Sequence, residues 1–202
     1  MCSRYHVDDG MFDEIRETVS VIERNALTCL GDIRPSDNAP VIDGATLELR
    51  LGIMRWGFPK SDGKGLLINA RSETAAQKPA FREGLLNRRC VIPASQFYEW
   101  DRTKRRAVFS CPDSPLLCFA GLYRVNSDGP RFVILTTEAN ESVLPVHSRM
   151  PLLIERHQIT GWIYDSRQAQ SILRQKMPVI NRKFVSEKSQ NPQLYLFPDV
   201  IE

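Results

Sequence analysis

Apolar residues recur near the start of the chain at the spacing of an amphipathic helix. Between residues 11 and 30 they follow the three-to-four-residue period that gives a helix one buried face, at Met11, Phe12, Ile15, Val19, Ile22 and Leu27. Asp8 or Asp9 is placed to cap such a helix, and Gly31 is placed to end it. The pattern predicts one long helix in this segment.

Beyond this helix the apolar runs are short and are separated by residues that favour turns. Strands are expected over 47–56, 66–70, 90–100 with a break at Pro93, 107–123 with a turn at 111–115, 131–137 and 152–154. Helices are expected over 74–86, from Ala139, over 158–164 and over 166–173, and loops or turns over 34–40, 61–65 and 126–130. The remainder, 178–181 and 191–200, is expected to be strand and tail. Many short strands with helices inserted between them predict an α+β fold on a mostly antiparallel sheet or barrel, in a single domain of residues 1–202.

Composition narrows the class of protein. Hydrophobic residues make up 42% and charged residues 25% of the 202 residues, which is typical of a globular protein and excludes a mainly disordered chain. No apolar run approaches the ~20 residues of a membrane span, so we expect a cytoplasmic protein whose five cysteines are reduced. Those cysteines and the three histidines lack zinc-site spacing, so neither a metal nor another cofactor is expected.

Charge is distributed unevenly along the chain. The net charge is +3, yet residues 71–106 carry nine Lys or Arg against four Asp or Glu, a local excess of +5. Such an excess suits contact with a polyanion such as nucleic acid. A solvated basic loop around 102–106 explains the same charges, so both interpretations stay open.

The N-terminus carries a distinctive chemical group. Cys2 follows Met1 directly, and a small second residue permits removal of the initiator methionine. The mature chain then has an α-amine and a thiol on one residue, with ordinary pKa values near 7.7–8.0 and about 8.5. This aminothiol can trap an aldehyde as a Schiff base and close it to a thiazolidine, or act as a nucleophile with its own amine as the base. A plain small residue at position 2 fits the position equally well.

Three polar residues, Asn69, Glu99 and His147, stand among apolar neighbours. Burying a polar group without a partner costs roughly a few kcal/mol, so each needs a hydrogen bond or a functional reason. A carboxylate among aromatic residues has its pKa raised toward neutrality, which suits acid–base catalysis, although strand alternation also permits Glu99 to face solvent. His147 is explained equally well as a hydrogen-bonded core histidine, and Asn69 as a partner of the backbone.

Arginines and aromatic residues accompany these positions. Arg4, Arg71 and Arg149 are suited to bind phosphate, and Trp56 or Phe58 to stack on an unpaired base. Each residue is weak evidence alone. Together the candidates describe a nucleophile, an acid, a histidine and a basic aromatic surface.

Five segments carry a resemblance to a known family: MCSR at 1–4, RWGF at 55–58, INARSET at 68–74, IPASQFYEW at 92–100 and LPVHSRMPLLI at 144–154. In order and spacing they resemble the SRAP family, the SOS-response-associated peptidases, over nearly the whole chain. The resemblance implies the SRAP fold and a protein of the DNA damage response. It further implies that an N-terminal cysteine, exposed by removal of Met1, forms a thiazolidine with the opened sugar of an abasic site in single-stranded DNA.

Residue roles follow from the same resemblance. Cys2 is the crosslinking nucleophile, Asn69 positions the N-terminal residue, Glu99 donates and accepts protons, and His147 assists the Schiff-base steps. The phosphate contacts fall on Arg4, Arg71 and Arg149, and the base-stacking wedge on Trp56 and Phe58. Asn38 and Pro40 belong to a DNA-contacting loop that is one residue shorter than usual, and Ser3 replaces a glycine.

Two other functions remain open at this point. One is an N-terminal nucleophile thiol peptidase or amidohydrolase, for which Met1 is a candidate substrate in the protein itself. The other is a non-covalent module that binds single-stranded DNA. The expected partner is single-stranded DNA with abasic sites rather than a membrane, and the expected state is a cytoplasmic monomer, associated with the nucleoid in a bacterium.

Overall fold

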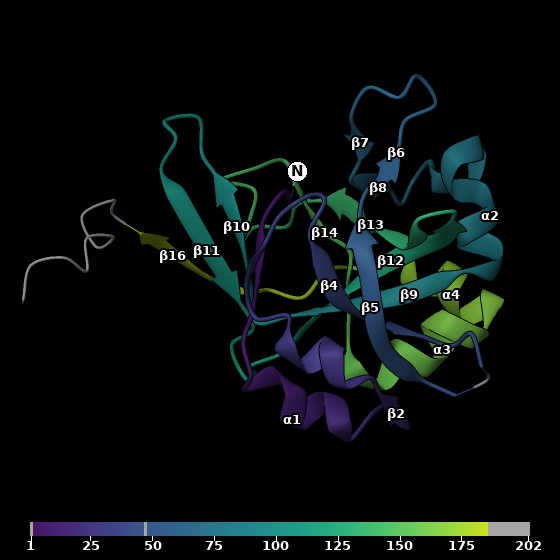
Figure 1. The fold of residues 1–202 in the computed structure, drawn as a ribbon. Coiled ribbons are helices and arrows are strands. Elements are labelled where there is room, and N and C mark those ends of the chain that lie inside the picture. The colour runs from purple at the N-terminus through teal and green to yellow at the C-terminus, as the bar shows by residue number, and fades with distance from the viewer. Residues whose placement is uncertain (1, 47, 186–202) are drawn as a thin grey trace, which may run out of the picture.

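A five-stranded barrel forms the centre of the molecule (Figure 1). The computed structural model describes residues 2–46 and 48–185. The barrel strands are β13 (Gly129–Glu138), β12 (Leu117–Asn126), β9 (Arg89–Ala94), β4 (Asn38–Asp43) and β5 (Arg50–Trp56). Each pairs antiparallel with the next, and β5 closes the barrel by pairing in parallel with β13 at Arg55 and Trp56.

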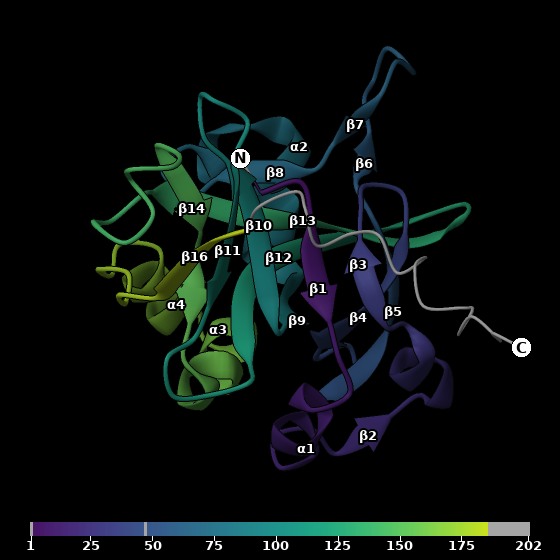
Figure 2. The same ribbon diagram turned by 90° about the vertical axis from the view of Figure 1, so that its left-hand side faces the viewer.

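Four short strands extend this sheet at its margins. They are β14 (Arg149–Pro151) and β8 (Asn69–Arg71) beside β13, β15 (Leu153–Ile154) beside β12, and β2 (Val21–Ile22) beside β5. β6 (Phe58–Pro59) and β7 (Leu66–Leu67) form a separate hairpin that projects from the body in both views (Figures 1 and 2).

A second, antiparallel sheet lies beside the barrel. Its strand order is β16 (Asn181–Val185), β11 (Arg106–Ser110), β10 (Gln96–Trp100), β1 (Tyr5–Val7) and β3 (Gly31–Ile33). The chain passes from the barrel into this sheet at Ser95, whose backbone N donates to His6 O at 2.9 Å. The N-terminal strand is therefore an inner strand of the second sheet.

Helices are short and lie outside the sheets (Figures 1 and 2). They are α1 (Met11–Arg16), α2 (Pro79–Asn87), α3 (Ile159–Tyr164) and α4 (Ser166–Ile172), with 3-10 turns η1 (Arg24–Thr28), η2 (Ala75–Gln77) and η3 (Arg156–Gln158). Pro79 occupies the first turn of α2, where a missing backbone N–H costs nothing.

A chain of aromatic rings joins the two sheets into one core. Trp56 stacks on Phe132 inside the barrel, at 6.0 Å between ring centroids, and its other neighbour is Tyr5 at 5.2 Å. Tyr5 meets Phe119 edge-on, and Phe119 in turn meets Phe97 of the second sheet. All five rings are fully buried, so the barrel and the second sheet share one apolar interior.

The structure confirms the predicted α+β class with a mostly antiparallel barrel core and corrects several elements. The helix expected over residues 11–30 ends at Arg16. Backbone N–H groups of Ser20 and Val21 instead donate to Leu49 O, because the open edge of β5 offers partners that a lone helix lacks. Gly10 rather than an aspartate is the N-cap, and Gly31 begins β3 with a φ of +96°.

Other boundaries also differ from expectation. The loop expected over 34–40 stops at residue 37, because β4 begins at Asn38. The break expected at Pro93 falls at Ser95, since β9 continues through Pro93 opposite Cys118. The segment from Ala139 forms turns around Asn140 rather than a helix, and Pro145 blocks further helical growth. The tail expected over 191–200 and the first residue of the 47–56 strand lie outside the described residues.

Gly121 tests how tightly the barrel wall is packed. A Cβ at this position would meet the Ile92 side chain and lie 2.9 Å from Val133 O. Gly121→Ala should therefore lower the free energy of unfolding by about 1–3 kcal/mol, measured by urea denaturation. Gly10→Ala is the control, since its Cβ would only touch Asp8 Oδ1 at 3.4 Å, and it should cost no more than about 0.5–1 kcal/mol through a weaker N-cap of α1. Equal stabilities of the two variants would mean that the barrel wall accommodates an added methyl group at residue 121 without strain.

Candidate active site around Cys2

Cys2 lies three residues ahead of β1 and is fully buried. Asn69 Nδ2 donates a hydrogen bond of 2.8 Å to the Cys2 carbonyl, and the Cys2 thiol points toward Arg4 O at 3.8 Å. Asn69 is the first residue of β8, which runs parallel to β13. Figures 1 and 2 both place the N-terminus beside β8, β10 and β14. The barrel thus holds the start of the chain through a residue 67 positions away.

Glu99 occupies the middle of β10 and points inward, with 4% of its surface exposed. The solvent-facing orientation that strand alternation permitted is therefore wrong. Burial raises the pKa of the Cys2 thiol well above its ordinary range, and the negative charge of Glu99 raises it further. The Cys2 thiol accordingly keeps its proton at neutral pH.

His147 leads directly into β14 and is half-buried. Its Nδ1 lies 3.0 Å from the backbone N and 3.2 Å from the carbonyl O of Arg149, so the strand backbone fixes the imidazole ring. β14 and β8 both pair with β13, at Thr136 opposite Pro151 and opposite Arg71. Asn69 on β8 and His147 just ahead of β14 are thereby brought to the same end of the barrel.

Arg149 is engaged by a carboxylate. Its two terminal nitrogens lie 2.8 and 2.9 Å from the two oxygens of Glu73, and one of them also donates to Thr136 O. The Arg149 hydrogen bonds lower the pKa of Glu73, with Arg71 adding a smaller effect of the same sign. Arg71 itself is exposed on β8. Of these two arginines, Arg149 is the one held by a fork-to-fork ion pair.

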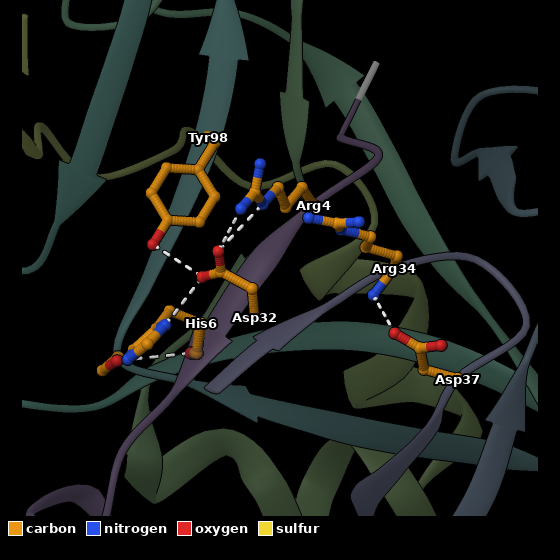
Figure 3. A network of polar contacts seen from close by, with 7 residues as sticks. Arg4, His6, Asp32, Arg34, Asp37 and Tyr98 are labelled. Atoms are coloured by element: carbon orange, nitrogen blue, oxygen red, sulfur yellow. Dashed lines mark hydrogen bonds and ion pairs between the residues drawn. The ribbon is translucent and has the colours of Figure 1, made fainter. Parts of the chain in front are cut away.

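Arg4 belongs to a second network, centred on Asp32 of β3 (Figure 3). Arg4 donates to Asp32 through Nε at 3.0 Å and through a terminal nitrogen, His6 Nδ1 lies 2.8 Å from Asp32, and the Tyr98 hydroxyl donates to it at 3.0 Å. Partial burial raises the pKa of Asp32, but the hydrogen bonds from His6, Arg4 and Tyr98 outweigh burial and lower it. The ionised Asp32 carboxylate ties together β1, β3 and β10.

The expected base-stacking residues are in the core. Trp56 is fully buried between Tyr5 and Phe132, and its Nε1 donates to Ile68 O at 2.9 Å. Phe58 is buried beneath the Arg124 guanidinium, which lies 4.4 Å from its ring centroid. Neither ring presents a face to solvent in this structure, so neither forms the surface that the sequence led us to expect.

The two residues of the expected DNA-contacting loop belong to β4. Asn38 is exposed at the start of the strand, opposite Arg55, whereas Pro40 is buried opposite Ile53. Asp32 and Glu73, which hold the two arginines, were not singled out by the sequence. Each is an ordinary acidic residue in the chain, and only long-range pairing reveals its role.

The family model described as SOS response associated peptidase (SRAP) matches residues 1–189. The chain belongs to this family. Among its relatives, the "Abasic site processing protein YoaM" of Bacillus subtilis is 38% identical over 180 residues, which cover 81% of this chain and 79% of the relative. The "Abasic site processing protein YedK" of Escherichia coli is 24% identical over 140 residues, covering 65% of this chain and 63% of the relative.

Solved structures share the SRAP-family fold seen here. A protein from Bacteroides thetaiotaomicron superimposes with a TM-score of 0.79 at 19% identity, covering 93% of each chain. One from Bordetella bronchiseptica gives 0.76 at 22% identity, covering 92% of this chain and 100% of the other. Within residues 2–46 and 48–185, the helices are too short to cross a membrane.

The state of the Cys2 thiol can be tested by alkylation. Iodoacetamide reacts with thiolates. In the native protein at neutral pH, the buried and protonated Cys2 should therefore be labelled more slowly than the half-buried Cys111. Mass spectrometry of the labelled peptides measures both rates. In urea the two rates should become similar, which controls for intrinsic reactivity. Faster native labelling of Cys2 than of Cys111 would contradict the buried, protonated state.

Proposed function

We propose that this protein captures abasic sites in single-stranded DNA by a covalent bond to Cys2. The observation that carries the proposal is the placement of Cys2 in a buried site. Asn69 donates a hydrogen bond to its carbonyl, and the charge of Glu99 raises the pKa of its thiol. Relatives that the family includes are named abasic site processing proteins. An abasic site supplies an aldehyde, which is the functional group that an N-terminal aminothiol traps.

The reaction requires removal of Met1, because the peptide bond to Met1 otherwise consumes the Cys2 amine. Removal by the protein itself and removal by a cellular aminopeptidase leave the same terminus. The new α-amine would arise on the residue whose carbonyl Asn69 already holds. Asn69 is therefore the positioning residue for the nucleophile.

The chemistry proceeds in three balanced steps. Glu99 takes the proton of the anomeric hydroxyl and returns one to the ring oxygen, so that the ring C–O bond breaks and the aldehyde is exposed. The Cys2 amine then adds to the aldehyde carbon, and loss of one water leaves a C=N bond. The thiol sulfur finally bonds to that carbon, while its proton passes by way of Glu99 to the imine nitrogen. The product is a neutral thiazolidine, and the net change is the loss of one water.

A protonated thiol suits this order of events. Because burial and Glu99 raise its pKa, the thiol does not compete with the amine for the aldehyde, and it loses its proton as the ring closes. His147, fixed by the backbone of Arg149, is assigned to proton transfer in the Schiff-base steps and in reversal. The buried position of Cys2 also favours a single strand, since an unpaired nucleotide reaches such a site at lower cost than a base-paired one.

Phosphate binding falls to arginines around this site. Arg71 is exposed on the same strand as Asn69, two residues further along. Arg4 and Arg149 lie close by in the fold, and each already faces a carboxylate. In this arrangement Arg71 makes the first contact with DNA, and Arg4 and Arg149 join it by exchanging Asp32 or Glu73 for phosphate.

Variants at Cys2 separate the roles of amine and thiol. Fully processed wild type, mixed with a single-stranded oligonucleotide carrying one abasic site, should give a slow band on a denaturing gel. Cys2→Ser and Cys2→Ala keep the amine but lose the sulfur, so they should give a band only after borohydride reduces the Schiff base. A chain that retains Met1 should give no band without borohydride, because its terminal amine and its thiol lie on different residues and cannot close a thiazolidine.

Other outcomes of this gel identify other functions. Salt-sensitive binding without any band, with or without borohydride, would indicate a non-covalent DNA-binding module. Hydrolysis of peptide amides that depends on Cys2, again without a band, would indicate a thiol peptidase. Either result with processed wild-type protein would reject covalent capture.

Glu99 is tested by its isosteric amide. Glu99→Gln keeps the shape of the side chain but removes the proton-transfer group, so crosslinking should slow by roughly 10²- to 10⁴-fold. Gel quantification of band formation against time measures this rate. Glu17→Gln is the matched control, because Glu17 is an exposed acidic residue that pairs with Arg156 away from the site. An unchanged rate in Glu99→Gln would exclude Glu99 as the proton carrier.

A further inference from the structure

An exposed aromatic ring lies between two arginines on the edge strand β16. Phe184 has 42% of its surface exposed. The guanidinium carbon of Arg105 lies 4.8 Å from its ring centroid and that of Arg182 lies 5.8 Å away. Exposing a phenylalanine of this size is unfavourable in water unless something covers it. The two neighbouring guanidinium groups indicate that the covering ligand carries negative charge.

Strand register places Phe184 on the same sheet face as Glu99. Phe184 lies opposite Ala107 of β11, and Ala107 lies opposite Glu99 of β10. Directly opposed residues of antiparallel strands point to the same side of a sheet, and neighbouring strands lie about 4.8 Å apart. The Phe184 backbone is therefore about 10 Å from that of Glu99. Figure 1 shows the three strands side by side, with β16 outermost.

Both arginines are held in position before any ligand binds. Asp101 accepts from Arg105 Nε at 2.9 Å, and Ser142 O accepts from a terminal nitrogen of Arg182 at 3.0 Å. Each guanidinium thus stands beside the ring without first being ordered by the ligand. Binding to such a preorganised group loses less entropy than binding to mobile side chains.

A stacking surface is otherwise missing from the site. Trp56 and Phe58 are buried, and among residues 2–46 and 48–185 the exposed aromatic rings are Phe184 and Tyr164, at 42% and 39%. In those ranges these two are the exposed rings of Phe, Tyr and Trp, and the imidazole of His157 is exposed as well. Tyr164 ends α3, away from the second sheet. Single-stranded nucleic acid is bound by aromatic rings that stack on bases beside cations that meet the phosphates. The basic loop around residues 102–106 connects β10 to β11, and its Arg105 lies beside the Phe184 ring.

We propose that Phe184, flanked by Arg105 and Arg182, is the stacking platform for a nucleobase of the strand that enters the Cys2 site. The base stacks on the part of the ring that the guanidiniums leave exposed, and the two guanidiniums contact the adjoining phosphates. The location of the lesion at Cys2 rests on the function proposed above. The platform itself requires only single-stranded DNA.

The test compares Phe184 with the other exposed aromatic. Undamaged single-stranded oligonucleotide is the probe, and fluorescence anisotropy gives the dissociation constant. Phe184→Ala should weaken binding by roughly five-fold or more, whereas Tyr164→Ala should leave it unchanged. Phe184→Trp should restore binding, and stacking should quench the fluorescence of the new indole relative to wild type treated in the same way.

Each outcome decides the proposal. Rescue by tryptophan with quenching supports stacking, because a merely structural role would not give that signal. Equal affinities of the Phe184→Ala and Tyr164→Ala variants, or weak binding by a folded Phe184→Trp, would overturn it. Covalent capture is scored separately on the abasic oligonucleotide with wild type. Binding that depends on Phe184 without any crosslink would reject the covalent function and keep the platform.

Discussion

The packing of the Tyr5 ring is the constraint on which the site depends. Chain termini fray unless something ties them down, yet here the third residue after Cys2 is fully buried against Trp56 of the barrel and Phe119. Each aromatic pair adds about 0.5–1.5 kcal/mol beyond the apolar area that it buries. Backbone hydrogen bonds from β10 and from the residue before it then secure this segment, as Tyr98 N donates to Arg4 O and Ser95 N to His6 O. Without this anchor the N-terminal cysteine would have no fixed place.

Around that anchor the site is assembled from segments far apart in the sequence. Asn69 comes from a short strand beside β13, Glu99 from the second sheet, and His147 from the turn before β14. None of these elements forms a stable unit alone, because β8 and β14 take their hydrogen-bond partners from β13, and β10 takes its partners from β1 and β11. The two sheets therefore fix the positions of these side chains. The proposed chemistry depends on a few polar groups at the junction of the two sheets.

Sequence reasoning succeeded where a local pattern carried the information. Short apolar runs predicted four of the five barrel strands but not β4, whose first residues were expected to be a loop. Polar residues in apolar runs drew attention to Asn69, Glu99 and His147, and of these Asn69 hydrogen-bonds to the Cys2 carbonyl. Sequence patterns did not predict features that depend on contacts between residues far apart in the chain. The edge of β5 recruits residues 20–22 and ends the first helix early, an effect that no local period encodes. Burial of Trp56 depends on which side of a barrel wall it faces, and Asp32 and Glu73 acquire meaning only through arginines from other strands.

The ion pairs of Arg4 with Asp32 and of Arg149 with Glu73 bear on how such a protein would search DNA. An arginine that already faces a carboxylate adds little to the long-range field, so it does little to draw a passing phosphate from a distance. A phosphate can pair with such an arginine only by displacing the carboxylate at close range, once the DNA strand is bound. The ion pairs therefore reduce the long-range attraction of DNA but leave both arginines able to bind phosphate at close range. Intact strands would leave quickly, and only a strand held long enough to seat would be retained.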